Sequence, residues 1–313
     1  MGLKAPLYLT IFGSWMMGFG AAALLEYAPN ASLWFPPAGI TFAAALVLGL
    51  RALPVLWLGC LVVTVLGDQV YQRGTAWPEL LLAGLAFAVT HTLLYAAMGM
   101  SLRSRPVNPS STPEWGSVIK FLVGGALAAG LSSLFGGLSL AYSGMVEFAA
   151  LPSLIITWWI GDYAGLITVG PLFALLLTRL AAALNVVSAD RALEILGPDP
   201  MRLLWPKAAG KLAALALLTA FMIAMLLNLG EHPGLMYILL ACLPLQIWIA
   251  STESPLATLL GVFGVALILA AAAGTTHLSN HAPVLQVVVI TLAAASYLSL
   301  AAARHLRQKT LTA

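Results

Sequence analysis

Apolar segments of roughly membrane-spanning length recur along the whole chain, and this repetition constrains the fold more than any other feature. We count ten, at about residues 7–25, 38–50, 52–67, 80–101, 117–141, 153–180, 210–229, 234–251, 255–273 and 283–303. A helix needs about 20 residues to cross a bilayer. Helices also satisfy their own backbone groups in lipid. The pattern predicts an all-α, polytopic integral membrane bundle of about ten transmembrane segments.

The composition supports this prediction. Only 8% of the 313 residues are charged and 61% are hydrophobic, whereas soluble domains carry about 25% charged residues. The run after Lys4 lacks a convincing cleavage site, so we interpret it as the first membrane helix. Cys60 and Cys242 lie in apolar runs and are expected to act as small hydrophobic residues without a disulfide.

The number of spans depends on the second and third segments, which only Arg51 separates. The second segment has 13 residues, which reach about 20 Å as a helix against a hydrocarbon core of about 30 Å. A membrane-embedded hairpin of these two segments would leave eight spans. The prediction is therefore eight to ten.

Basic residues predict the orientation. With the N-terminus inside, 13 of the 14 Lys and Arg residues fall on the cytoplasmic side and only Arg73 falls outside. Both termini are then cytoplasmic. Because the basic residues sort by side of the membrane, the net charge of +3 does not indicate a nucleic-acid partner, and none is expected.

The predicted sensor domain covers residues 1–306. Its first part is 1–184, a polar cytoplasmic linker follows at 185–209, and the second part is 210–306. The tail at 307–313 is expected to begin a signalling helix. Residues 300–309 favour helix, contain no Gly or Pro, and predict a helix that continues to about Lys309.

The most informative stretch is Trp158-Trp159-Ile160-Gly161-Asp162-Tyr163-Ala164-Gly165. A carboxylate in mid-membrane costs roughly 2.5–3.5 kcal/mol, so Asp162 must face a partner, a water-filled cavity or a proton. The nearby glycines allow a neighbouring backbone to approach. We expect Asp162 to face protein or a cavity and never lipid. A purely structural aspartate, hydrogen-bonded to a neighbouring helix, is the alternative.

A second stretch, Leu33 to Pro37, is expected to enter the outer leaflet as extended chain, because Pro36 and Pro37 suit a helix entry. Irregular backbone at that depth must be buried in protein or line a cavity. The indole N–H of Trp34, or a backbone N–H before Pro36, is expected to donate to Asp162. The alternative is that Trp34 is an ordinary interfacial aromatic residue.

Histidines offer two further candidates. His91 is either a proton-responsive partner for Asp162 or a neutral histidine bonded to a backbone carbonyl. His277 and His281 have a spacing that suits a metal. No Cys or acidic residue is near them, so solvated loop histidines are the better interpretation. No metal or cofactor is expected.

Enzyme motifs are absent from the sequence. Gly161-Asp162 is similar to the motif of intramembrane aspartyl proteases. These enzymes need a second membrane aspartate to share the proton, and this sequence has only one. The sequence has no phosphate-binding loop or zinc-protease motif. We therefore predict that the chain is not an enzyme.

Three stretches together resemble the bacterial membrane-associated sensor domain of the first type (the MASE family, type one). They are Leu33-Trp34-Phe35-Pro36-Pro37-Ala38-Gly39-Ile40, then 158–165 with Pro171, and more weakly Leu243-Pro244-Leu245-Gln246-Ile247-Trp248. The resemblance covers about residues 7–303. It implies an integral-membrane input module of histidine kinases, diguanylate cyclases or phosphodiesterases. The chain departs from the family at 251–255, where an Arg-Phe-Gly-Pro-like turn is missing.

The predicted function is sensory input for two-component or cyclic-di-GMP signalling in the bacterial inner membrane. Because no output domain follows Ala313, we expect an excised sensor region or a stand-alone member. Expected partners are membrane lipids, an unknown small ligand or membrane protein, and a second copy of the chain. The alternatives are a small-solute transporter and a membrane scaffold.

The expected binding site is an outward-facing cavity enclosed by the segments at 7–25, 38–50 and 153–180. Its walls are expected to carry the aromatic residues of both motifs together with Asp162. The candidate ligand-binding or signalling residues are Trp34, Phe35, Pro36, Pro37, Trp158, Trp159, Gly161, Asp162 and His91.

Overall fold

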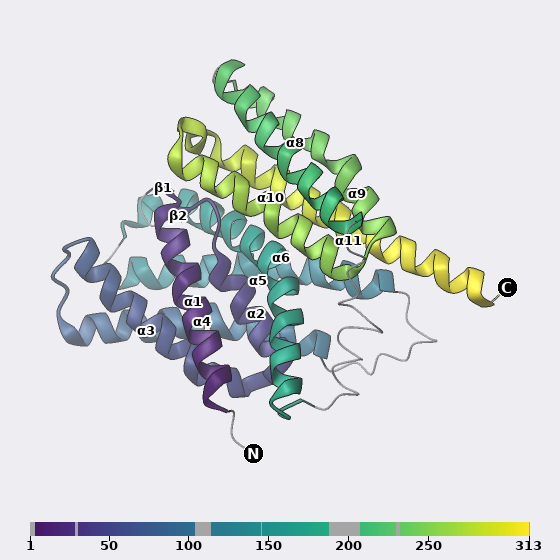
Figure 1. Cartoon of the computed structure of the whole chain (residues 1–313). Helices are drawn as coiled ribbons and strands as arrows, with labels where there is room; N and C mark the ends of the chain where they lie inside the picture. Colours follow the sequence, from purple (N-terminus) through teal and green to yellow (C-terminus); the bar gives the residue numbers. More distant parts are fainter. Residues whose placement is uncertain are drawn as a thin grey trace.

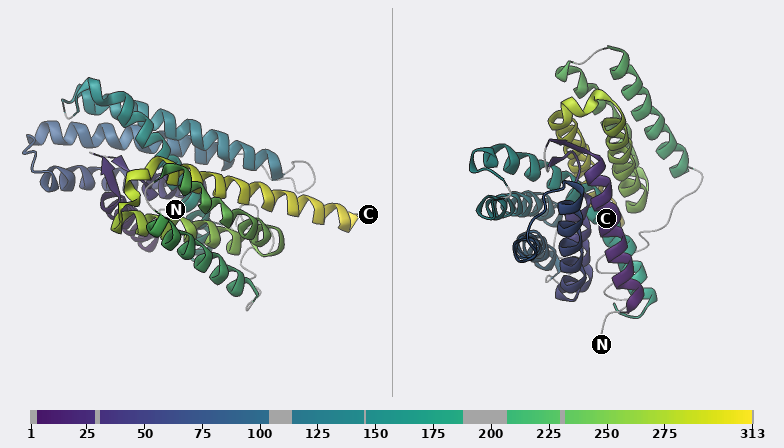
Figure 2. Two further views of the ribbon diagram at one scale, coloured as in Figure 1. Left: turned by 90° about the horizontal axis from the view of Figure 1, so that it is seen from above. Right: turned by 90° about the vertical axis from the view of Figure 1, so that its left-hand side faces the viewer.

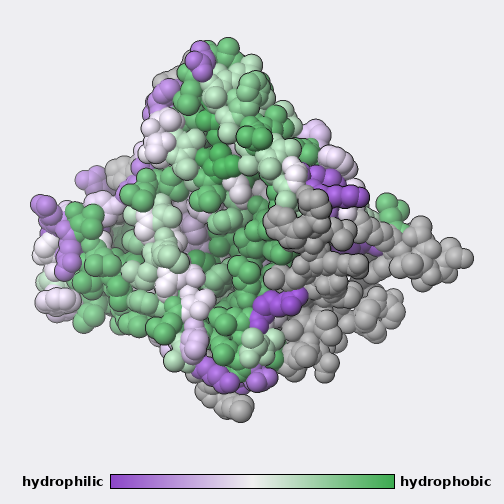
Figure 3. All heavy atoms as spheres, in the orientation of Figure 1, coloured by the Kyte–Doolittle hydropathy of each residue, from purple (hydrophilic) through white to green (hydrophobic). Residues whose placement is uncertain are grey.

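Long apolar helices make up almost the whole structure. The computed structural model describes residues 4–28, 31–103, 114–144, 146–187, 207–229 and 232–312. Within these ranges, nine helical stretches are long and apolar enough to cross a membrane. The chain is therefore a multi-pass α-helical membrane protein, as the apolar segments predict. Figure 3 shows apolar side chains over much of one face and hydrophilic side chains mainly at its margins.

The first part of the chain forms six helices, coloured purple to teal in Figure 1. They are α1 (Ala5–Leu24), α2 (Pro36–Leu48), α3 (Leu53–Val70), α4 (Trp77–Arg103), α5 (Glu114–Tyr142) and α6 (Leu151–Ala183). A short antiparallel ribbon of β1 (Glu26–Ala28) and β2 (Ala31–Ser32) lies between α1 and α2. Each helix corresponds to one of the first six predicted segments, and the observed ends differ from the predicted ones by a few residues.

The second part forms a group of helices coloured green to yellow, which packs on α6 (Figures 1 and 2). Its α-helices are α8 (Lys207–Leu229), α9 (Leu243–Thr252), α10 (Pro255–Thr275) and α11 (Ala282–Thr312). Two 3₁₀ segments, η3 (Pro233–Cys242) and η4 (His277–His281), precede α9 and α11. The last helix runs through Lys309 to Thr312, which confirms the predicted helical extension.

The short helix α2 is enclosed by protein. All 13 of its residues except Leu46 are buried, so it does not need to match the bilayer thickness by itself. A 3₁₀ turn, η1 (Gly49–Ala52), joins it to α3, and the stretch from Pro36 to Val70 counts as one of the nine candidate spans. This stretch contains two of the ten predicted segments, so the nine candidates correspond to those ten, and the number of membrane crossings stays a prediction.

Glycines on α6 hold the extended chain before α2 close to the helix backbone. A Cβ atom added to Gly165 would lie 2.0 Å from the carbonyl oxygen of Phe35. One added to Gly161 would lie 2.6 Å from that of Ser32. The N–H of Phe35 donates to the carbonyl oxygen of Gly161 at 3.2 Å. The prediction of a close backbone approach beside Asp162 is confirmed.

Two lysines connect neighbouring helices at their ends. Lys120 Nζ donates to the carbonyl oxygen of Ser101, and Lys211 Nζ pairs with Glu253 Oε1 at 2.5 Å. These contacts join the start of α5 to the end of α4, and the start of α8 to the end of α9. The orientation in a membrane stays a prediction. Most of the predicted linker at 185–209 lies outside the described residues, since 188–206 are not described.

Candidate functional site

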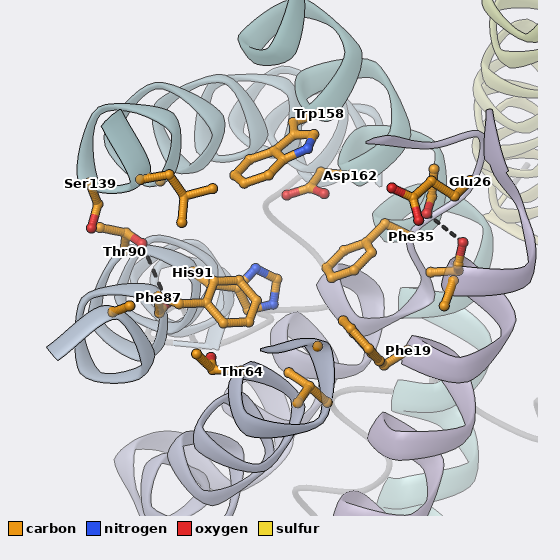
Figure 4. Close-up of a pocket in the computed structure, with 18 of the residues that line it drawn as sticks. Phe19, Glu26, Phe35, Thr64, Phe87, Thr90, His91, Ser139, Trp158 and Asp162 are labelled. Carbon is orange, nitrogen blue, oxygen red and sulfur yellow. Dashed lines mark hydrogen bonds between the residues drawn. The ribbon is translucent and has the colours of Figure 1, made fainter. Parts of the chain in front are cut away.

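A cavity of about 200 Å³ opens among α1, α3, α4, α5 and α6 and the chain between α1 and α2 (Figure 4). Its wall is mostly apolar, with five large aromatic side chains: Phe19, Phe35, Tyr71, Phe87 and Trp158. Three acidic residues and one arginine also line it. The lining includes Phe19, Glu26, Phe35, Asp68, Arg73, Phe87, Thr90, His91, Ser132, Trp158, Gly161 and Asp162.

Asp162 lines this cavity and is only 9% exposed. Its Oδ2 atom accepts a hydrogen bond from the hydroxyl of Tyr95 on α4 at 2.7 Å. The carboxyl group therefore faces protein and a cavity, as predicted. The predicted donor, however, is wrong, because Tyr95 takes the place expected for Trp34 or a backbone N–H.

Trp34 lies away from the cavity. Its side chain is 4% exposed, and its Nε1 donates to Thr168 Oγ1 on α6 at 2.8 Å. Its ring centroid is 6.0 Å from that of Phe263 on α10. Trp34 is thus neither a cavity wall nor an interfacial aromatic residue. It instead joins the extended chain to α6 and to the second group of helices.

Three other predicted site residues also lie outside the cavity lining. Pro36 and Pro37 begin α2 and are buried, and Pro36 packs near Gly18 of α1. Trp159 is 45% exposed, and its Nε1 donates to the carbonyl oxygen of Ala126 on α5 at 2.8 Å. Phe35, Trp158, Gly161, Asp162 and His91 do line the cavity.

The predicted walls of the cavity are therefore wrong in part. The α1 and α6 helices contribute as expected, but α3, α4 and α5 replace α2. The extended chain lines the cavity through Ser32 and Phe35, whereas α2 contributes no residue to the lining among the described residues. Small residues such as Gly67, Ala83 and Gly136 leave room on the three additional helices. These small residues were the sequence feature from which a cavity beside α3, α4 and α5 could have been predicted.

His91 is 2% exposed and surrounded by aromatic rings. Its Nε2 lies 3.3 Å from Thr41 Oγ1, which accepts a hydrogen bond from Trp15 Nε1 at 3.1 Å. Its ring centroid is 5.0 Å from that of Tyr95. Tyr95 rather than His91 donates to Asp162, so His91 is an indirect neighbour of the carboxyl group.

The mouth of the cavity is formed by charged residues from β1 and the end of α3. The Tyr71 hydroxyl donates to Glu26, and the Arg73 guanidinium lies 4.8 Å from the centre of the Tyr71 ring. Burial, followed by the hydrogen bond to Glu26, raises the pKa of Tyr71 to about 12. The hydroxyl therefore stays protonated at neutral pH and keeps its hydrogen bond to Glu26.

The pair His277 and His281 does not form a metal site. Among the described residues, no group of three or more His, Cys, Asp or Glu side chains could hold a metal ion. His277 is exposed on η4, as expected for a solvated histidine. His281 is only partly exposed, and its Nε2 is buried without a hydrogen-bond partner among the described residues. Its predicted solvation is wrong in this respect.

Comparisons with protein-family models, curated proteins and solved structures found no match to this chain.

Proposed function

We propose that the protein is a membrane-embedded sensory input module of the bacterial inner membrane, for two-component or cyclic-di-GMP signalling. A ligand enters the cavity from the outer side and changes the packing of helices around Asp162. The last helix carries this change to the cytoplasmic side. In this proposal the chain supplies input and no catalytic step.

The observation that carries the proposal is the pair of hydrogen bonds that α11 makes beside the cavity. Gln286 Nε2 donates to the carbonyl oxygen of Leu33 at 3.0 Å. The Tyr297 hydroxyl donates to the carbonyl oxygen of Ile167 on α6 at 2.5 Å. Helix α11 is thus attached to the extended chain beside Asp162 and to α6, the helix that carries Asp162.

These attachments support the proposed route from the cavity to the last helix. Asp162 and Ile167 are five residues apart on α6, or about 7.5 Å along its axis. A displacement of α6 at the cavity therefore acts on the Tyr297 contact. A ligand produces such a change only if it binds two packings with different affinities, so the two states must differ in the shape of this cavity.

A small-solute transporter is the second candidate function. An acid at membrane depth and a non-helical entry beside it are typical of transporter sites, and Asp162 beside the Ser32–Phe35 chain provides both. Uptake of solute into proteoliposomes would favour this candidate. A scaffold function would instead show as stable co-purification of another membrane protein.

Fusions that vary the helical phase after α11 test the sensory proposal. An output cyclase is joined after Ala313 through helical linkers that are extended by one residue at a time. Each added residue turns the output domain by about 100°, so cyclase activity should rise and fall with a period near 3.6 residues. Activity that is independent of linker length would contradict transmission through a rigid α11.

A further inference from the structure

We propose that the cavity binds a small amphipathic organic cation, namely an amine with an apolar ring or short alkyl chain. This inference rests on the proposed sensory function and specifies its ligand class. It combines the carboxyl group at the inner end of the cavity, the aromatic walls, and the charge at the mouth.

The carboxyl group of Asp162 provides the anchor for the amine. Tyr95 donates to Oδ2, and among the described residues this is the hydrogen bond that the carboxyl group receives. The second oxygen, Oδ1, is left for a donor in the cavity. An ammonium group has three N–H donors, and hydrogen bonds between ionised partners are about twice as strong as neutral ones. A bound amine would also offset the cost of a carboxylate at membrane depth.

Aromatic rings surround the position that the ligand would occupy. Trp158 and Phe35 lie on either side of Asp162 in Figure 4, and Phe87 lies across the cavity from Trp158. Phe35 is also in edge contact with Phe19, with ring centroids 6.4 Å apart. Ring faces attract cations within about 6 Å, and the same rings suit an apolar ligand body. An anion with the same apolar body would lose the attraction to the ring faces and would be repelled by the carboxylate of Asp162.

The charges along the path select for cations. Glu26 and Asp68 at the mouth, with Asp162 inside, give three acidic residues against the single Arg73 in the lining. Arg73 lies over the Tyr71 ring at the mouth. A cleft with one dominant sign of charge concentrates ligands of the opposite sign. Free carboxylates and phosphates should therefore be excluded.

The volume restricts the size of the ligand. An apolar cavity of about 150 Å³ accepts benzene, and this cavity measures about 200 Å³. A single ring with a two- or three-carbon chain and an amine matches that space. Large peptides and sugars do not fit inside, which makes 2-phenylethylamine a suitable probe.

Isothermal titration of the whole purified chain in detergent tests the inference. The probes are 2-phenylethylamine, its neutral analogue 2-phenylethanol, and the anion 3-phenylpropionate. We expect saturable binding of the amine and none of the anion. Asp162→Asn should weaken amine binding by about 10- to 100-fold, as expected for loss of a charged hydrogen bond. Glu147→Gln, an acid-to-amide change at an exposed residue outside the cavity lining, should leave it unchanged.

Equal binding of all three probes, or amine binding that Asp162→Asn does not weaken, would overturn the cation assignment. Absence of amine binding would also overturn it. The proposed sensory function is tested separately by the cyclase fusions. A fusion that responds to helical phase without amine binding would retain the sensor and reject only this ligand class.

Discussion

Asp162 shows how a single acidic residue is accommodated inside a membrane protein. Its neighbour Tyr95 is 67 residues away in sequence, and their hydrogen bond joins α6 to α4. The cost of a membrane carboxylate made it predictable that Asp162 would face protein. The identity of the donor was not predictable, because it depends on which helices pack together. One available signal was that Tyr95 and His91, four residues apart, share a face of α4.

Replacement of Tyr95 by phenylalanine should destabilise the protein. Tyr95→Phe preserves the ring but removes the donor to Asp162, and a buried acceptor without its partner costs about 1–3 kcal/mol. The free energy of unfolding in detergent should fall by that amount. Tyr237→Phe removes a hydroxyl from a side chain that is 48% exposed and should have little effect. Equal stability of the two variants would show that the Tyr95 contact is unimportant.

At the scale of elements, the close contact between α6 and the extended chain before α2 forms part of the cavity wall. Gly161 and Gly165 give this chain space, and the Phe35 N–H bond fixes it against α6. Gly39 on α2 extends the close contact, since an added Cβ atom would lie 2.7 Å from the carbonyl oxygen of Gly165. Close backbone packing through small residues is typical of membrane helices.

Alanine at position 165 should disrupt this contact. Its Cβ atom would overlap the carbonyl oxygen of Phe35, so the extended chain must move, at a cost of about 1–3 kcal/mol for overpacking. Thermal unfolding in detergent should show a lower midpoint for Gly165→Ala. The matched control is Gly20→Ala in α1, where an added Cβ atom meets nothing within 4 Å. If the control lost as much stability, helix composition rather than overlap would be responsible.

Most helices could be predicted from apolar length alone, because lipid imposes that length on each span. The short α2 and the extended chain before it were also predictable from Pro36, Pro37 and 13 apolar residues. The cavity walls were not. Apolar periodicity does not tell which helices are neighbours when nearly every face is apolar, so Trp34 and Trp159 could not be distinguished from Trp158.

On the scale of the whole molecule, a ligand can enter from the outer side only if the cavity mouth faces outward. The sorting of basic residues predicts that 185–206 lies inside and the turn before α11 outside. Cys60 and Cys242 are both free and buried, which limits background labelling. In intact cells, an impermeant thiol reagent should label Ser279→Cys and spare Ser188→Cys. The opposite pattern would place the cavity mouth on the cytoplasmic side and reject the outward-facing site.

The arrangement of the two helix groups brings the last helix beside the cavity. The second group contacts the first through α6, α10 and α11, and α11 continues to Thr312 (Figure 1). The sequence predicted the length of this last helix from its residues. It could not predict that Gln286 and Tyr297 would bind the segments beside Asp162, since those contacts span 253 and 130 residues.

The most direct test of the central claim is the activity of a cyclase fused to α11 when Asp162 is changed. Asp162→Asn retains the shape and the acceptor for Tyr95, so it should fold. Glu147→Gln, an exposed residue outside the cavity lining, serves as the control. Asp162→Leu removes the polar group from the cavity. At equal amounts of protein in the membrane, Asp162→Leu should shift cyclase output at least several-fold from wild type. Output from Asp162→Leu that equals wild type would contradict the claim that this cavity governs signalling.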